Sequence, residues 1–178
     1  MSLWKWLGLE GTPAAREADG VDRVEQALAG LDPVKARYVA CFTYILTRSA
    51  RADHEVTDAE AREMARIVAE QGAIPPEQAA AVIDVARAQA LRSGGTEDFI
   101  VTREFNEMAT REQKLALLDC LFTVSATDES ILTVEDNEIR RVANELKLEH
   151  ADYIAVRARH LAHLAVLREK NRPCTSER

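Results

Sequence analysis

The chain has 178 residues, of which 47% are hydrophobic, and its formal charge is −7 at pH 7. This length and apolar fraction are enough for one domain with its own core, and the few glycines and prolines, seven and five, favour helices over a sheet. The acidic balance argues against a nucleic-acid-binding protein, which would present a basic face, and suits the binding of cations or of a basic partner.

The three cysteines, Cys41, Cys120 and Cys174, are too few and too scattered for a disulfide framework or a thiolate zinc site. We expect Cys41 and Cys120 to be buried small apolar residues, in a protein of the reducing cytoplasm. No stretch approaches the roughly 20 apolar residues of a membrane-spanning helix.

Both tryptophans, Trp4 and Trp6, lie in an N-terminal segment and linker over residues 1–20 that lacks the pattern of a secretory signal. Two interpretations stay open for this segment. It either packs on the domain or on a partner, or it contacts a membrane interface, where Trp is favoured.

From residue 21 on, caps and hydrophobic periodicity predict eight helices and no strand. We expect them at about 21–29, 33–51, 58–71, 76–92, 98–108, 111–126, 134–146 and 150–168. Asp32 and Pro33 are the N-cap and first-turn residues of the second helix, Gly72 is expected to stop the third, and Thr110 with Gln113 forms a capping box before the sixth. The chain is therefore predicted to be all-α.

One acidic signature occurs twice at a constant spacing. Its members recur 75 positions later in the second half, as the pairs Asp53/Asp128, Glu60/Glu135, Glu63/Glu138, Arg66/Arg141 and Glu70/Glu145. The hydrophobic positions keep the same register. We therefore predict a single helical domain over 21–170, built from two similar repeats at about 32–93 and 96–168, and a disordered tail over 171–178.

In each half the Asp lies between two helices, and the two Glu residues share one face of the second helix. Two roles suit this arrangement. As structural groups, the acids would accept backbone N–H bonds at the turn and favour the helix N-terminus. As ligands, they would converge on a divalent cation, which binds carboxylate oxygens. The candidate metal ligands are Asp53, Glu60, Glu63, Asp128, Glu135 and Glu138.

Other chemistry finds less support. An EF-hand is excluded, because the twelfth position counted from either corner Asp is Met64 or Ile139, where a bidentate glutamate is required. His160 and His163 lie one helical turn apart, but no Cys or acid beside them in sequence completes a metal site, so we expect ordinary half-exposed histidines. The chain carries no phosphate loop, nucleophile elbow or His-Glu-x-x-His motif, and we expect no enzyme activity.

The duplicated unit of helix, Ala-x-Asp corner and helix beginning with Glu resembles the TerB-like tellurite-resistance family. The same fold supplies the N-terminal domain of certain membrane-anchored DnaJ-type co-chaperones. The family pattern is roughly Ala-x-Asp-Gly-x-hydrophobic-x-x-x-Glu. The first half is compared with it over residues 50–60, with Asp53 and Glu60, and the second over residues 126–135, with Asp128 and Glu135. The resemblance covers about residues 32–167.

This resemblance implies a compact bundle of about seven to eight helices with a pseudo-two-fold axis and an acidic surface that binds metal ions. It also implies a role in stress response or partner binding, often near the inner membrane. It carries over Asp53, Glu60, Asp128 and Glu135 as site residues, whereas the internal repeat alone adds Glu63 and Glu138. The glycine that follows the family's Asp is His54 in one half and Glu129 in the other, and Glu takes the positive φ of such a glycine less comfortably.

The sequence therefore predicts a non-catalytic, cytoplasmic stress-response protein that binds a divalent cation, a protein partner or both through its acidic corners. The alternative is a scaffold peripheral to the membrane, recruited through Trp4 and Trp6, in which the acids are purely structural. No nucleic-acid partner is expected.

Overall fold

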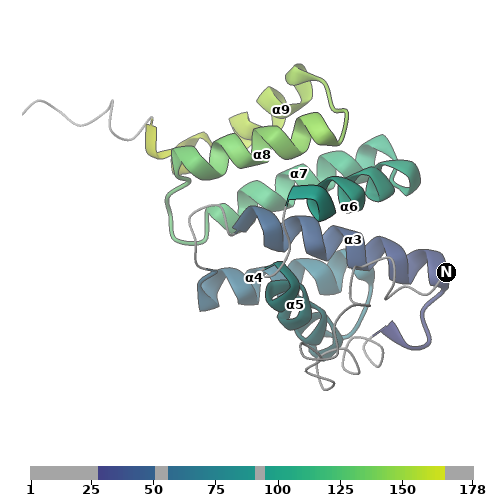
Figure 1. Cartoon of the computed structure of the whole chain (residues 1–178). Helices are drawn as coiled ribbons and strands as arrows, with labels where there is room; N and C mark the ends of the chain where they lie inside the picture. The colour runs from purple at the N-terminus through teal and green to yellow at the C-terminus, as the bar shows by residue number, and fades with distance from the viewer. Residues whose placement is uncertain (1–27, 51–55, 91–94, 167–178) are drawn as a thin grey trace, which may run out of the picture.

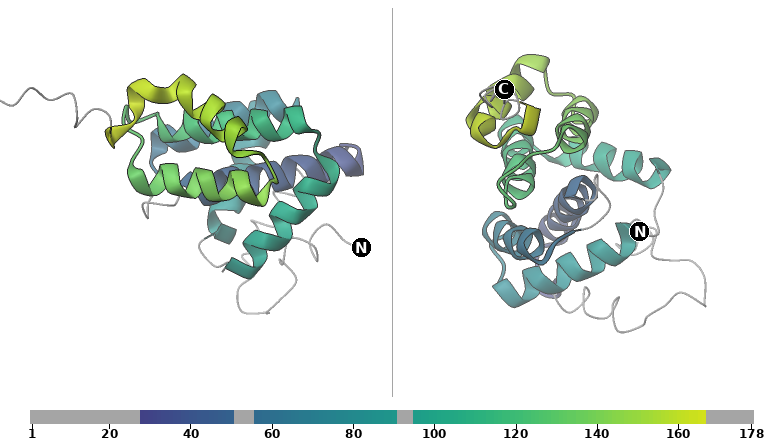
Figure 2. Two further views of the ribbon diagram at one scale, coloured as in Figure 1. Left: turned by 90° about the horizontal axis from the view of Figure 1, so that it is seen from above. Right: turned by 90° about the vertical axis from the view of Figure 1, so that its left-hand side faces the viewer.

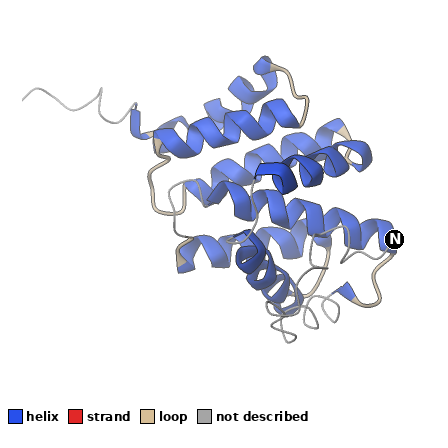
Figure 3. Ribbon diagram, viewed as in Figure 1, coloured by secondary structure: helices blue, strands red, loops and turns tan. Residues whose placement is uncertain are grey.

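The computed structural model describes residues 28–50, 56–90 and 95–166, and this part of the chain forms seven α-helices and one 3-10 helix, without a strand (Figures 1 and 3). The predicted all-α bundle is confirmed for these residues. The elements are α3 (Pro33–Ala50), α4 (Asp58–Gly72), α5 (Pro76–Ala90), α6 (Gly95–Met108), α7 (Arg111–Ser125), α8 (Thr133–Glu145), α9 (His150–Arg157) and η1 (Ala158–His163).

Helix α3 is the centre of the bundle. Every residue from Val39 to Ala50 is buried, because α4, α5, α6, α7 and α8 all pack against this helix (Figures 1 and 2). A helix surrounded in this way must be apolar on all sides, and its sequence is nearly so.

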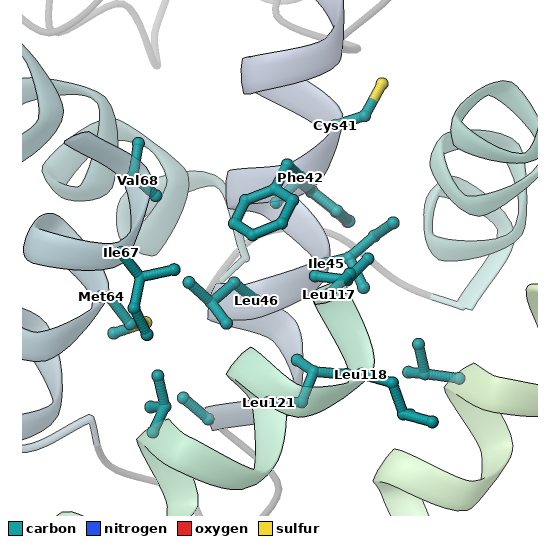
Figure 4. Packing of buried hydrophobic residues seen from close by; sticks show 14 of the residues in the cluster. Cys41, Phe42, Ile45, Leu46, Met64, Ile67, Val68, Leu117, Leu118 and Leu121 are labelled. Atoms are coloured by element: carbon teal, nitrogen blue, oxygen red, sulfur yellow. The ribbon is translucent and has the colours of Figure 1, made fainter. Parts of the chain in front are cut away.

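The core joins the two halves of the chain. Figure 4 shows Leu46 of α3 among Met64 and Ile67 of α4 and Leu117 and Leu121 of α7, all at most 3% exposed. These residues belong to one contiguous hydrophobic cluster that also reaches α5, α6, α8 and α9. The helices that follow the two acidic corners, α4 and α8, therefore pack on one shared apolar core.

The helices are arranged in layers, with α4 and α5 on one side of α3 and α7, and α8 and α9 on the other (Figure 1). Helix α3 contacts both α4 and α8, and α7 likewise contacts both α8 and α4. The pseudo-two-fold symmetry implied by the resemblance stays a prediction.

Two of the predicted caps are confirmed. The Asp32 carboxylate accepts the N–H groups of Val34 and Lys35, at 2.9 and 3.2 Å, where α3 begins. Thr110 and Gln113 exchange hydrogen bonds of 2.8 and 3.3 Å before α7. Helix α6 starts at Gly95 rather than at residue 98, so the predicted boundary was wrong by three residues.

Gly72 ends α4 as predicted, but the left-handed residue that closes the helix is Ala73, with φ of 44°. The reason for glycine at position 72 is contact with α3. A Cβ atom there would lie 3.0 Å from Cγ2 of Val39. Gly72 therefore permits the close approach of two helices.

The prediction of one continuous helix over 150–168 was wrong. Helix α9 ends at Arg157, a 3-10 helix follows, and His160 leaves helical geometry with φ of −107° and ψ of 15°. The break lets Leu164 enter the core at 1% exposure. The backbone beside it pairs with Ile131, which donates to the His163 carbonyl at 2.7 Å and accepts from Ala165 N–H at 3.0 Å.

Several predictions fall outside the described residues: the Trp4 and Trp6 segment with its linker, most of the helix at 21–29, and the tail. Leu28, at the end of that helix, is described and is buried. Within the described ranges no helix is both long and apolar enough to cross a membrane.

Candidate functional site

The first acidic corner leads into α4. Glu60 is 7% exposed, and its carboxylate accepts the N–H of Thr57 at 2.7 Å and the Thr57 hydroxyl at 2.9 Å. In return, the Glu60 N–H donates to Oγ1 of Thr57 at 3.2 Å. These reciprocal bonds are a capping box, which satisfies backbone donors at the start of the helix. The corner's other predicted ligand, Asp53, lies outside the described residues.

The second acidic corner is built in the same register. Glu135 is 4% exposed, and its carboxylate accepts the Leu132 N–H at 2.7 Å. Leu132 stands at the repeat position of Thr57 but has no hydroxyl, so its side chain cannot return the bond. Asp128 is exposed and accepts the Ser130 N–H at 3.3 Å.

Glu129 follows Asp128 with φ of 68°. This is the left-handed conformation that the family's glycine position led us to expect there, and a non-glycine residue adopts it at a cost. The turn therefore adopts a backbone conformation that favours glycine, with a glutamate in its place.

Glu63 lies on the surface of α4 with two charged neighbours. The Arg66 guanidinium binds both oxygens of Glu63, at 3.0 and 2.5 Å, and Oε1 of Glu70 at 2.6 Å. The hydrogen bonds from Arg66 hold the pKa of Glu63 below its ordinary value. Because Arg66 and Glu70 are more than half exposed, these pairs contribute little to stability.

Glu138, at the repeat position of Glu63, has an additional partner from another helix. The guanidinium of Arg48, at the end of α3, donates to Oε1 of Glu138 through Nε at 3.0 Å. It also binds both oxygens of Glu145, at 2.8 and 3.1 Å. Arg141 contacts the same two carboxylates from the solvent side, at 3.6 and 3.0 Å.

This network is largely removed from water. The Arg48 side chain is 7% exposed, and the side chains of Glu138 and Glu145 are 18% and 19% exposed. Burial alone would raise the pKa of Glu145, but the hydrogen bonds and charges of Arg48, Arg141 and Thr102 outweigh it and hold that pKa below its ordinary value. Thr102 of α6 completes the network by donating to Oε2 of Glu145 at 3.2 Å.

Arg48 was missed by the sequence analysis, although a signal exists. Between Arg37 and Arg51 it is the only charged residue in an otherwise apolar or neutral stretch of the chain. A charge on a helix that is buried all round must find ionic partners, because an unpaired buried charge is very costly. Its partners lie 90 and 97 positions away, which no local pattern reveals.

We expected no acid near His160, but the structure places one there. Its Nε2 lies 3.1 Å from Oδ1 of Asp119 on α7, and its ring stacks on Phe122 at a centroid distance of 5.3 Å.

Cys41 is buried as expected, whereas Cys120 is only half-buried; both are free thiols.

Within the described ranges no group of three or more His, Cys, Asp or Glu side chains is placed to hold a metal ion. Five of the six predicted ligands lie in these ranges, and each has the protein partner given above: Glu60, Glu63, Asp128, Glu135 and Glu138. The predicted metal site, which also needs Asp53, stays a prediction.

In these ranges the chain is a compact all-α bundle with two acidic corners whose carboxylates cap helices and bind arginines. The family model of the tellurite resistance protein TerB matches residues 39–158, which include both corners. The chain therefore belongs to the TerB family, and the resemblance expected from the corners is confirmed. No curated protein and no solved structure matches the chain.

Proposed function

We propose that this TerB-family protein is non-catalytic and contributes to tellurite or related stress resistance by binding a protein partner. The observation that carries this proposal is the occupation of the corner carboxylates. Glu60 and Glu135 are buried helix caps, and Glu138 is bound to a buried arginine. A cation at these groups would have to replace hydrogen bonds that hold helix ends, each of which contributes about 0.5–1.5 kcal/mol.

The proposal includes the pseudo-two-fold relation of the two halves. It is supported by the constant offset of 75 positions between equivalent acids. The contacts between helices also support it. Helix α3 packs on α4 of its own half and on α8 of the other, and α7 packs on α8 of its own half and on α4 of the other. Equivalent surfaces of the two halves can then be compared residue by residue.

The test of the proposed function uses the full chain, including the segment with Trp4 and Trp6. Affinity-tagged protein is purified from tellurite-exposed cells in EDTA and run on a sizing column. We expect a partner protein that co-elutes in stoichiometric amount and stays bound in EDTA. Loss of that partner from a Trp4→Ala/Trp6→Ala variant would place the contact in the N-terminal segment. A protein that elutes alone under all conditions contradicts the proposal.

Cation binding is the second candidate, and the exposed Asp128 carboxylate at the turn favours it. The test is thermal unfolding of EDTA-stripped protein against Ca²⁺, Mg²⁺, Mn²⁺ and Zn²⁺. A bound ion at a hundredfold excess over its dissociation constant stabilises the fold by about 2.7 kcal/mol. A saturable rise in the midpoint with one ion, lost in Asp53→Asn/Asp128→Asn, would favour this candidate.

A further inference from the structure

The two halves carry the same pair of carboxylates, but the described residues give the two pairs different partners. In the second half, Glu138 and Glu145 bind Arg48 of α3 in addition to Arg141 of their own helix. The equivalent pair in the first half is Glu63 and Glu70, which we call the open carboxylate pair. These two bind Arg66 of their own helix.

Thr123 of α7 stands at the repeat position of Arg48. Its hydroxyl donates to the Asp119 carbonyl of its own helix, α7, at 2.9 Å. Helix α7 packs on α4, as α3 packs on α8. The first half therefore has the supporting helices, and among its described residues no second guanidinium binds this carboxylate pair.

Helix α4, which carries the open carboxylate pair, packs on α7. Cys120 lies one turn before Thr123, and burial raises the pKa of its thiol to about 12, with further effects from Asp119 and from the charges of Arg66, Glu63 and Glu70. The α4 charges are thus close enough to act on the α7 side chain that precedes Thr123.

Exposure separates Glu70 from its counterpart Glu145, and charge separates the two pairs. The side chains of Glu138 and Glu145 are 18% and 19% exposed, whereas those of Glu63 and Glu70 are 22% and 60% exposed. Counting described residues, the two carboxylates of the second half bind two arginines, and those of the first half bind one. The open carboxylate pair therefore keeps an excess negative charge that solvent can reach.

We propose that the open carboxylate pair, together with Thr123, binds an arginine side chain of a protein partner, which occupies the place that Arg48 has in the second half. The inference rests on the proposed function, because it supplies the chemistry of the partner. A guanidinium fits this place better than an ammonium, since it can bind one carboxylate through two parallel N–H bonds and a second carboxylate through another N–H, as Arg48 binds Glu145 and Glu138. The net charge of −7 also attracts a basic segment.

The test is an NMR titration of the full chain with an acetylated, amidated Gly-Arg-Gly peptide and with its Gly-Lys-Gly counterpart. We expect the arginine peptide to shift amide signals of α4 and α7 around Glu63, Glu70 and Thr123, and to bind more tightly than the lysine peptide. Glu63→Gln/Glu70→Gln should weaken binding by about tenfold, because the charge-assisted bonds are lost. Glu70 is exposed and Glu63 is partly exposed, so the fold should be retained.

Thr123→Arg tests whether the partner's arginine binds at the position equivalent to Arg48. It supplies in the same chain the guanidinium that we expect from the partner, and it should abolish binding of the arginine peptide. The charge-matched control Glu77→Gln/Asp84→Asn removes two exposed acids of α5 and should leave binding unchanged. Equal weakening in this control, or shifts elsewhere on the protein, would show general attraction to an acidic protein and overturn the inference. Absence of any shift would also overturn it.

The two proposals fail separately. If a partner co-purifies and binds Thr123→Arg and Glu63→Gln/Glu70→Gln as tightly as the unaltered protein, the proposed function stands and this binding surface is wrong. If the arginine peptide binds at the open carboxylate pair but no partner co-purifies, the surface stands and the proposed function is wrong.

Discussion

Arg48 and Glu145 lie 97 positions apart in the sequence, and the guanidinium of the first binds both carboxylate oxygens of the second, at 2.8 and 3.1 Å. The pair ties the end of the central helix α3 to the end of α8. Glu138 adds a second carboxylate to the same guanidinium. One of the candidate metal ligands, Glu138, thus helps to join the two halves.

Replacing Arg48 by Met should destabilise the protein by about 3 kcal/mol, because it leaves two largely buried carboxylates facing each other with one exposed arginine between them. The measurement is urea unfolding at neutral pH. The matched control is Arg66→Met in α4, whose ion pairs are exposed and whose loss should cost at most about 1 kcal/mol. Equal costs for the two variants would contradict a structural role for the Arg48 network.

Acid should weaken the same network. The pKa of Glu145 in the folded protein lies below the value of about 4.3 that it has when unfolded. Between these two values the unfolded chain binds the extra proton, so this stabilisation is complete above the unfolded pKa and is lost as the pH falls through the folded pKa. Urea unfolding of the unaltered protein and of Glu145→Gln, at pH values from 7 down to 2.5, should show a stability difference that shrinks below about pH 4.3. A difference that stays constant across this range would contradict the assignment.

The capping glutamates give a test that separates fold from ligand binding. Glu60→Ala should destabilise the metal-free protein by about 1–2 kcal/mol, because the Thr57 N–H loses its acceptor at the start of α4. Glu60→Gln should restore much of this loss, since glutamine can also complete a capping box. The exposed Glu77 of α5 is the control, and Glu77→Ala should cost within about 0.5 kcal/mol. If Glu60→Ala were neutral or stabilising in the metal-free protein, the carboxylate would be a poised ligand rather than a cap.

The sequence predicts what depends on neighbours in the chain. The cap at Asp32 and the box of Thr110 with Gln113 follow from side chains two or three residues away, and both are present. The corner acids follow from the repeat, and so does the equal placing of Glu60 and Glu135 three residues after their N-cap residues. Each of these features is decided by local geometry.

Features that depend on contacts between distant residues could not be predicted from local sequence patterns. Gly72 looks like a helix stop, but it is glycine because α4 touches Val39 of α3. The chain leaves helical geometry at His160 because Leu164 is drawn into the core beside Ile131, which no pattern within 150–168 encodes. Arg48 finds its partners on α8 only after the bundle has assembled. The choice between capping and ligand roles for the acids needs these same contacts.

Ala73 is held in the left-handed region with φ of 44°, where it closes α4 by donating its N–H to the Glu70 carbonyl at 3.3 Å. A side chain with a Cβ atom pays roughly 1–2 kcal/mol for this conformation, and glycine does not. Ala73→Gly should therefore stabilise the protein by about 0.5–1 kcal/mol, after allowance for the greater freedom of glycine in the unfolded chain. The urea midpoint should rise while the slope of the transition stays the same. Ala80→Gly, at an exposed position inside α5, is the control and should lower stability by about 1 kcal/mol. A lower midpoint for Ala73→Gly would mean that the alanine methyl group contributes more than its strain costs.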